Sequence, residues 1–272
     1  MNQSAFGQAD GTALAKPSPL AGFTSANQPA HPPDIAALAH ANWAPHPGTP
    51  AIPNNKIVNA KGVPGTLGCF ARTRHDERLV VVSSWHVLFG AGAREGDPVW
   101  LLDELHGGRR YERAADAWFG RIGTLRYGGD DFHVDCGIAT WLHRCEAPPA
   151  AGTVHAAAPP PVIARPDAVS PGEIVTKTGA ATGTTTGVII DAEFCSIAET
   201  DGRAFKTSRQ LLIRSIDDGP FSRDGDSGAL VVNRRNEGIG LLWGVTPRGE
   251  GVACHLAAAF YALDLKFPEA RA

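Results

Sequence analysis

The chain has 272 residues, of which 43% are hydrophobic and 19% charged, and its formal net charge is −3. This composition excludes an intrinsically disordered chain and a coiled coil. The acidic balance argues against a nucleic-acid partner bound through its phosphates. No run approaches the ~18 consecutive apolar residues that span a bilayer, so we expect no membrane partner either. The 31 glycines and 21 prolines favour short strands joined by turns.

The cysteines and the N-terminal sequence bear on the compartment. Five cysteines is an odd number, and they are spread along the chain without paired spacing, which is not the pattern of a disulfide scaffold. The first ten residues have neither the basic nor the apolar region of a secretory signal. The sequence therefore predicts a cytoplasmic protein in a reducing environment.

Residues 1–56 form a Pro/Ala-rich N-terminal arm that holds nine of the 21 prolines. One short helix is expected in it, over 33–43, after a proline pair. We expect the rest of the arm to contact its own domain or a partner.

From residue 57 the pattern changes to short β-type runs. A first half, 57–150, and a second half, 173–272, are separated by a Pro- and Ala-rich linker, 151–172. Two clusters of short strands predict two β-barrels or sandwiches in tandem, and the spacing of apolar residues over 255–265 predicts a C-terminal helix. The runs predicted as strands are 68–72, 79–83, 97–102, 118–122, 134–142, 173–177, 186–192, 210–214, 229–232 and 239–245.

A serine between glycines is the first candidate for chemistry. The segment Gly225-Asp226-Ser227-Gly228 runs directly into the strand predicted at 229–232. A tight glycine turn exposes a serine hydroxyl and lets backbone N–H groups point at a developing oxyanion. A polar turn before a strand is an equally good interpretation of this motif alone.

A serine nucleophile needs a base, and the base needs an orienting group. His86 follows the apolar run 79–83, and Asp135 lies near the start of the run 134–142. Each of these residues alone is more typical of a structural position. Together with Ser227 they have the composition of a Ser-His-Asp triad.

These motifs resemble the trypsin-like, chymotrypsin-fold serine peptidases, and most closely the bacterial members without a secretion signal. The resemblance covers about residues 57–265, and the spacings 135 − 86 = 49 and 227 − 135 = 92 are similar to those of the family. It implies an all-β fold of two tandem antiparallel β-barrels, with a short C-terminal helix. The matching segments, in family order, are 62–69, 83–88, 134–139, 177–187, 221–228 and 240–244.

The resemblance implies a role for each matching residue. His86 is expected to be the general base, Asp135 its orienting carboxylate and Ser227 the nucleophile. The N–H groups of Gly225 and Ser227 are expected to form the oxyanion hole. The implied function is a serine endopeptidase that hydrolyses a protein or peptide through an acyl-enzyme, with no metal and no cofactor.

Substrate binding is expected at two places, both with departures from the family pattern. Phe221 stands at the pocket base, where members specific for basic residues have an acid, so cleavage after Arg or Lys is not implied. Leu242, Trp243 and Gly244 match the strand that pairs with substrate, although 240–244 is one residue shorter than usual. Val87 replaces a cysteine of many secreted relatives, in agreement with a reducing compartment.

Asp226 raises the question of activation by cleavage. In secreted relatives the matching aspartate binds a new N-terminus, and Lys56-Ile57-Val58-Asn59 is similar to such a cleavage site. Only 86 − 57 = 29 residues separate Ile57 from His86, fewer than that mechanism normally has. We therefore predict that Asp226 pairs with an internal cation, with Arg223 as the candidate, and that cleavage is not needed.

Other functions fit the sequence less well. An α/β-hydrolase needs its acid and histidine after the serine, and only His255 follows Ser227, 28 residues on. A zinc set of His133, Cys136, His143 and Cys145 would lie along one predicted strand, where alternate side chains point to opposite faces. The remaining alternative is a peptidase-fold module that is catalytically silent or autoinhibited.

Overall fold

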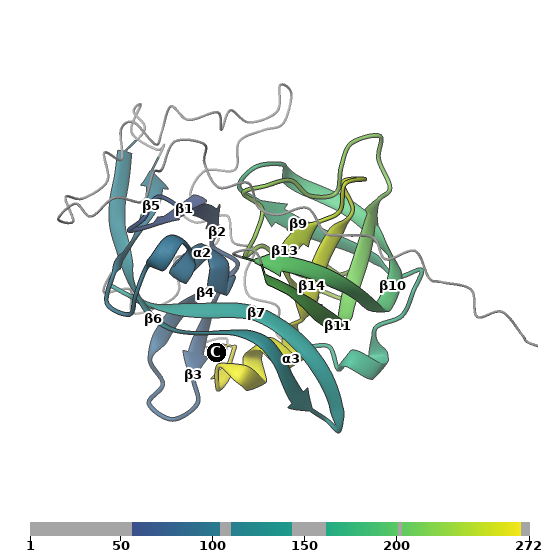
Figure 1. Cartoon of the computed structure of the whole chain (residues 1–272), viewed down its shortest axis with the longest axis horizontal. Helices are drawn as coiled ribbons and strands as arrows, with labels where there is room; N and C mark the ends of the chain where they lie inside the picture. The colour runs from purple at the N-terminus through teal and green to yellow at the C-terminus, as the bar shows by residue number, and fades with distance from the viewer. Residues whose placement is uncertain (1–55, 104–109, 143–161, 201–202, 268–272) are drawn as a thin grey trace, which may run out of the picture.

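The computed structural model describes residues 56–103, 110–142, 162–200 and 203–267. The helix expected over 33–43, all of the N-terminal arm before residue 56 and most of the linker lie outside these residues. Within the described residues the chain is mainly β-structure in two halves (Figure 1), with the first half in blue and teal beside the second half in green.

The first half forms one curled sheet of eight strands, in the order β15-β3-β4-β7-β6-β5-β1-β2. Strands β6 and β7 form a long antiparallel hairpin, and β4 pairs with β7. The short helix α2 (Trp85–Phe89) follows β4 directly, and a single 3-10 turn, η1 (Gly90–Gly92), follows α2. The strands are β1 (Lys56–Asn59), β2 (Pro64–Thr66), β3 (Cys69–Thr73), β4 (Leu79–Ser83), β5 (Pro98–Asp103), β6 (Arg110–Tyr127), β7 (Asp130–Trp141) and β15 (Leu265–Lys266).

The second half forms a sheet in the order β12-β9-β10-β11-β14-β13-β8, and an additional pairing of β12 with β13 closes six of its strands into a barrel. A 3-10 turn, η2 (Pro166–Ala168), precedes β9, and the helix α3 (Leu256–Ala262) follows β14. The strands are β8 (Val162–Ile163), β9 (Ile174–Gly179), β10 (Gly183–Thr200), β11 (Arg203–Ser215), β12 (Leu230–Asn233), β13 (Glu237–Val245) and β14 (Gly251–His255).

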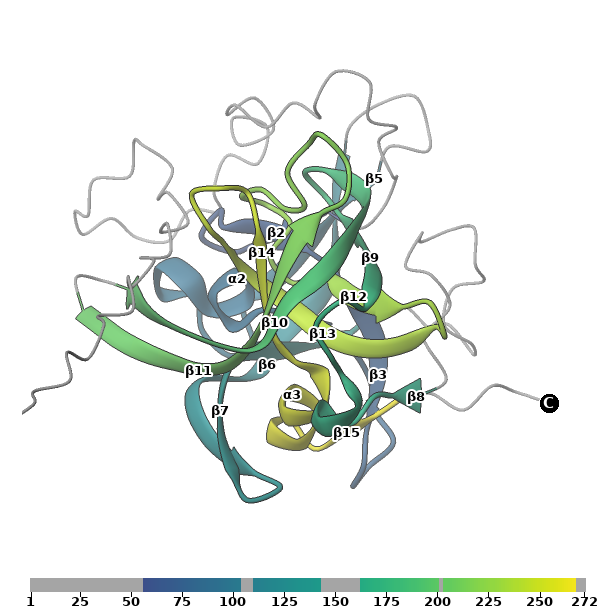
Figure 2. The same cartoon turned by 90° about the vertical axis from the view of Figure 1, so that its right-hand side faces the viewer.

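The predicted all-β architecture of two barrel-like halves with a short C-terminal helix is confirmed. The halves differ in one respect: the second is a closed barrel, whereas the first is a curled sheet with β2 and β15 at its edges. The domain boundaries at 57–150 and 173–272 stay predictions, but two elements cross them. Strand β8, inside the predicted linker, pairs parallel with β13, and β15 pairs with β3 of the first half (Figure 2).

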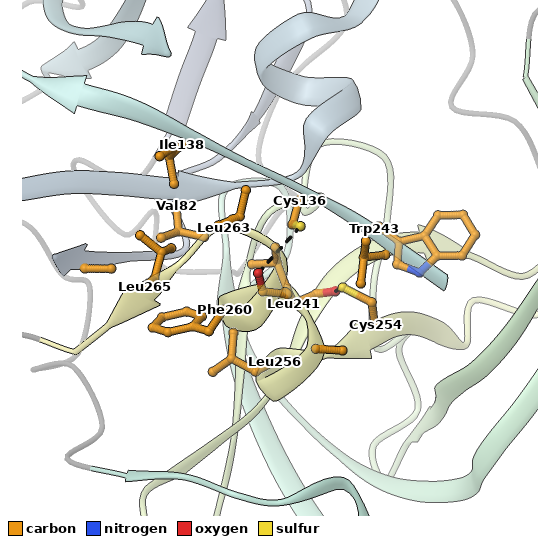
Figure 3. Close-up of a cluster of buried hydrophobic side chains, with 14 of the residues drawn as sticks. Val82, Cys136, Ile138, Leu241, Trp243, Cys254, Leu256, Phe260, Leu263 and Leu265 are labelled. Atoms are coloured by element: carbon orange, nitrogen blue, oxygen red, sulfur yellow. Dashed lines mark hydrogen bonds between the residues drawn. The ribbon is translucent and has the colours of Figure 1, made fainter. Parts of the chain in front are cut away.

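A buried hydrophobic core joins the halves (Figure 3). Val82, Cys136 and Ile138 of the first sheet pack in the same cluster as Leu241 and Cys254 of the barrel. Helix α3 adds Leu256 and Phe260 to this cluster. Full burial of one such large apolar side chain contributes about 1.5–3 kcal/mol, so this shared core holds the two halves in one arrangement.

The four described cysteines, Cys69, Cys136, Cys195 and Cys254, are free thiols. Burial raises the pKa of Cys69 and Cys254 to about 12, so these thiols stay protonated and act as small apolar core residues. None of the helices within the described ranges is long and apolar enough to cross a membrane.

Candidate active site

Helix α2 and strand β7 bring His86 and Asp135 together. Strand β4 pairs with β7 so that Ser83 lies opposite Gly137, which places the residues that follow β4 above the middle of β7. The His86 Nδ1 atom lies 2.7 Å from Asp135 Oδ2, and the backbone N–H of His86 donates to Asp135 Oδ1 at 3.2 Å. Both carboxylate oxygens therefore bind the histidine, and the Nδ1 bond leaves Nε2 as the nitrogen that can accept a proton.

The pair is electrostatically coupled. Burial alone would lower the pKa of His86, but the charge of Asp135 and the hydrogen bond to it, with a further contribution from the charge of Asp224, raise that pKa above its ordinary value. Burial opposes ionisation of Asp135, but the charge and hydrogen bonds of His86 hold the pKa of Asp135 below its ordinary value. Asp135 is thus a buried carboxylate that stabilises the protonated imidazole.

Ser227 lies in the turn before β12 and is half-buried. Its hydroxyl donates to the backbone carbonyl of Trp243, on β13, at 3.4 Å. The expected hydrogen bond to His86 is not among those that Ser227 makes with the described residues. The proton of the Ser227 hydroxyl is directed to the Trp243 carbonyl, and it must leave this long bond before His86 can accept it.

The turn before Ser227 presents backbone N–H groups. The N–H of Asp226 donates to the carbonyl of Arg223 at 3.0 Å, which closes a β-turn. Gly225 stands at the third position of this turn with φ of 100°, the conformation of a type II turn and one that glycine adopts at low cost. Within the described residues, the N–H groups of Gly225 and Ser227 donate to no protein acceptor, so both are available to an oxyanion.

Asp226 forms a buried ion pair with Lys177, not with the side chain of Arg223 as predicted. Lys177 Nζ lies 3.0 Å from Asp226 Oδ2, and both side chains are fully buried. Burial lowers the pKa of Lys177, and the charge of Asp226 partly offsets this effect. Arg223 contributes only its backbone N–H, at 3.1 Å, because its side chain is exposed.

Backbone and hydroxyl donors complete the shell around the Asp226 carboxylate. The N–H groups of Ala181 and Thr182 donate to Oδ1 at 2.9 and 3.1 Å, and the Thr182 hydroxyl donates to Oδ2 at 2.6 Å. Lys177 also donates to the Thr182 hydroxyl and to the Gly183 carbonyl. The carboxylate is thus saturated by donors from the chain itself, as the prediction of an internal cation requires.

The candidate activation segment is engaged elsewhere. Ile57 is buried in β1, where it lies opposite Gly65 of β2 and Leu101 of β5. Its backbone is part of the first sheet, whereas the Asp226 carboxylate is already bound by Lys177. The geometry therefore supports the prediction that the turn is held without a new N-terminus.

Two of the four predicted substrate-binding residues are fully buried. Phe221 and Leu242 lie in the hydrophobic core of the second barrel, so their side chains are not exposed to a substrate, and their part in substrate binding stays a prediction. Gly244 and Trp243 do border a depression next to Ser227, together with Ser222, Arg223, Asp224 and Val245.

The zinc set that the sequence disfavoured is only partly within the described residues. His133 and Cys136 are buried on β7, and His143 and Cys145 lie outside the described residues. Among the described residues, no three His, Cys, Asp or Glu side chains are placed to hold one metal ion.

Sequence reasoning missed Lys177 and Thr182 as partners of Asp226. A lysine within an otherwise β-type run, followed by a Gly- and Thr-rich turn, was the available signal. Lysine is rarely buried unless it is paired, and its place on a strand of the closed barrel required a partner inside.

Comparison of the sequence with protein-family profiles and with curated proteins gives no match. Solved structures do match. A glutamic acid-specific serine protease that uses a histidine triad in substrate binding is 12% identical, with a TM-score of 0.50 over 79% of this chain and 98% of that chain. The Nocardiopsis protease NAPase is 13% identical, with a TM-score of 0.51 over 80% and 99% of the two chains.

The fold is chymotrypsin-like. At these identities the likeness concerns the fold alone. This likeness in fold agrees with the resemblance drawn from the motifs. The segments that carry His86 and Asp135 lie in the first half, and the later segment that carries Ser227 lies in the second.

The Lys177–Asp226 pair gives a stability prediction. The change Lys177→Met leaves a buried carboxylate without its counter-charge, and breaking such a pair typically costs about 3–5 kcal/mol. We expect a decrease of that size in the free energy of unfolding, measured by urea denaturation. Arg165→Met is the matched control, because the Arg165–Asp167 pair is exposed and its loss should leave stability essentially unchanged. Equal stability of the two variants would contradict the prediction.

The His86 environment gives a titration prediction. Removing the negative charge of Asp224 destabilises the protonated imidazole, so Asp224→Asn should shift the His86 midpoint to lower pH, and Asp135→Asn should shift it further. NMR titration of the ring resonances measures this, with the His86 signals assigned by their loss in His86→Gln. Asp76→Asn, at the turn between β3 and β4, should leave the midpoint unchanged. A midpoint that stays or rises in Asp224→Asn would refute the assigned electrostatics.

Proposed function

We propose that the chain is a serine endopeptidase that hydrolyses peptide bonds through Ser227, His86 and Asp135. The single observation that carries this proposal is the pair of hydrogen bonds that the buried Asp135 carboxylate accepts from His86. A carboxylate costs free energy to bury, and here it orients one imidazole and raises that imidazole's pKa. This is the arrangement that a general base next to a serine requires.

The proposed reaction uses groups of the chain itself. Ser227 Oγ attacks the carbonyl carbon of the peptide as its proton passes to His86 Nε2, and the N–H groups of Gly225 and Ser227 bind the oxyanion. His86 then gives the proton to the departing amine, and Ser227 is left as an ester. Water then attacks this ester as it loses a proton to His86, and His86 passes that proton to Ser227 Oγ as the acid leaves, which restores the free serine.

One movement precedes the first step. The Ser227 hydroxyl turns away from the Trp243 carbonyl and toward His86 Nε2. Side-chain rotations of this kind take picoseconds to nanoseconds, and the single bond that opposes the rotation is long, at 3.4 Å. The rotation is therefore fast compared with typical turnover.

The second candidate function is a peptidase-fold module that does not turn over. The bond of the Ser227 hydroxyl to the Trp243 carbonyl, and not to His86, is the observation that favours it. The two functions differ in whether Ser227 is nucleophilic, and a reagent that reacts with activated serines separates them.

A fluorophosphonate probe tests the proposal. We expect the wild-type protein to be labelled above the pKa of His86, Ser227→Ala to remain unlabelled, and His86→Ala to react orders of magnitude more slowly, since loss of either group costs on the order of 10⁶ in kcat in a comparable enzyme. Ser208→Ala is the control, because this half-buried serine of β11 bonds to the Asp131 carbonyl and should not affect labelling. New internal termini in a digested denatured proteome, absent with Ser227→Ala, establish peptide-bond cleavage.

Two results decide between the candidates. Labelling that persists in Ser227→Ala would place the reactive serine elsewhere. An unlabelled wild-type protein with the His86–Asp135 pair intact by NMR would favour the silent module.

A further inference from the structure

Thr66 connects the first sheet to the turn that carries Ser227. It is the last residue of β2 and is fully buried. Its hydroxyl donates to the carbonyl of Gly225 at 2.9 Å and accepts the N–H of Ala180 at 3.0 Å. A threonine hydroxyl has one proton to donate, so these two bonds fix its orientation.

The backbone of Thr66 binds the same turn a second time. Its N–H donates to the carbonyl of Ser227 at 2.8 Å, so Thr66 binds the carbonyl groups on both sides of Asp226. Its own carbonyl accepts the Ser83 hydroxyl at 2.8 Å. Gly228 makes this approach possible, because a Cβ at that position would overlap the Thr66 carbonyl and the Ser83 hydroxyl.

These contacts supply a constraint that Gly225 lacks. Glycine is the most permissive residue for backbone rotation, and Gly225 already has φ of 100°. The Gly225 carbonyl belongs to the peptide group that follows Gly225, and the Ser227 carbonyl to the one that follows Ser227. The Thr66 hydroxyl and N–H hold these two peptide groups in place. They thereby fix the backbone positions of Gly225 and Ser227, on which the positions of both N–H groups depend.

Thr66 and the Asp226 carboxylate both bind the segment 180–182. Asp226 is bound by the N–H groups of Ala181 and Thr182, and Thr66 binds the N–H of the preceding residue, Ala180. The segment 180–182 of the second half is thus shared by both anchors, but only Thr66 comes from the first half. The turn is held in this form when the two halves are docked.

We propose that Thr66 is a positioning residue that holds the backbone of Gly225 and Ser227 in the place from which their N–H groups bind the oxyanion of the transition state. The inference rests on the proposed function. The inference goes beyond the proposed function, because it makes the oxyanion site depend on a hydroxyl of the first half, at the end of β2. The alternative is a purely structural hydroxyl, whose loss lowers stability and leaves the chemistry unchanged.

The test compares three variants of the full chain with p-nitrophenyl acetate, an activated ester whose hydrolysis by a serine also passes through an oxyanion. Thr66→Val keeps the shape of the side chain and removes both hydroxyl bonds. Thr66→Ser keeps the hydroxyl and serves as the conservative rescue. Thr207→Val removes another fully buried threonine hydroxyl, which bonds to Ser196 in the β10–β11 hairpin, and controls for the general cost of such a change.

We expect Thr66→Val to lower kcat by about 10- to 100-fold with little change in KM, because the lost interaction is made only in the transition state. Thr66→Ser should retain most of the wild-type kcat. Thr207→Val should lose comparable stability in thermal unfolding and keep its kcat. The inference is overturned if Thr66→Val keeps the wild-type kcat, or if its kcat falls no further than that of Thr207→Val.

Ser83→Ala provides a second approach if Thr66→Val does not fold. It removes the bond to the Thr66 carbonyl and leaves the Thr66 hydroxyl in place, so we expect a smaller fall in kcat, of a few-fold, in a folded protein. An unchanged kcat would overturn the inference. Failure of the proposed function is recognised separately: the wild-type protein would then show no Ser227-dependent ester hydrolysis, whereas failure of this inference alone leaves that hydrolysis intact and insensitive to Thr66.

Discussion

The docking of the two halves is the constraint on which the candidate site depends. His86 on α2 and Asp135 on β7 belong to the first half, and Ser227 belongs to the second, so neither half holds all three residues. The shared hydrophobic core and α3 set the distance between the halves. Buried polar contacts then set the register, for example the bond from the Ser84 hydroxyl to the Leu242 carbonyl at 2.9 Å. Apolar packing is non-directional, whereas these hydrogen bonds allow one alignment.

Two buried ion pairs divide the electrostatic work between them. The His86–Asp135 pair sets the protonation of the base, and the Lys177–Asp226 pair holds the shape of the turn before Ser227. Taking such charges out of water is costly, and a pair of apolar side chains would often be at least as stable. The presence of both pairs is better explained by the positions that they impose on the site than by a gain in stability.

Much of this arrangement could be predicted from the sequence, and the failures have physical reasons. Short β-type runs predicted the strands, and the resemblance of the motifs to a known family predicted that His86 and Asp135 lie together. The predicted partner of Asp226 was wrong because Arg223 was chosen for its closeness in sequence. Lys177 reaches Asp226 through the pairing of β9 with β12, which no local sequence pattern indicates. The full burial of Phe221 could not be predicted, because chain position does not tell which side of a loop faces the barrel interior. The edge strand β15 could not be predicted either, because it is only two residues long and lies far from its partner β3 in the sequence.

The return of β15 to the first sheet has a consequence for biosynthesis. The edge position beside β3 is filled by residues 265 and 266, and the Arg74 guanidinium donates to the Leu265 carbonyl at 3.0 Å. During translation the earlier strands leave the ribosome long before this segment, although domains generally begin to fold as they emerge. The edge of β3 therefore stays uncovered until residues 265 and 266 have been made, and the first half reaches its final form only after the strands of the second half have been synthesised.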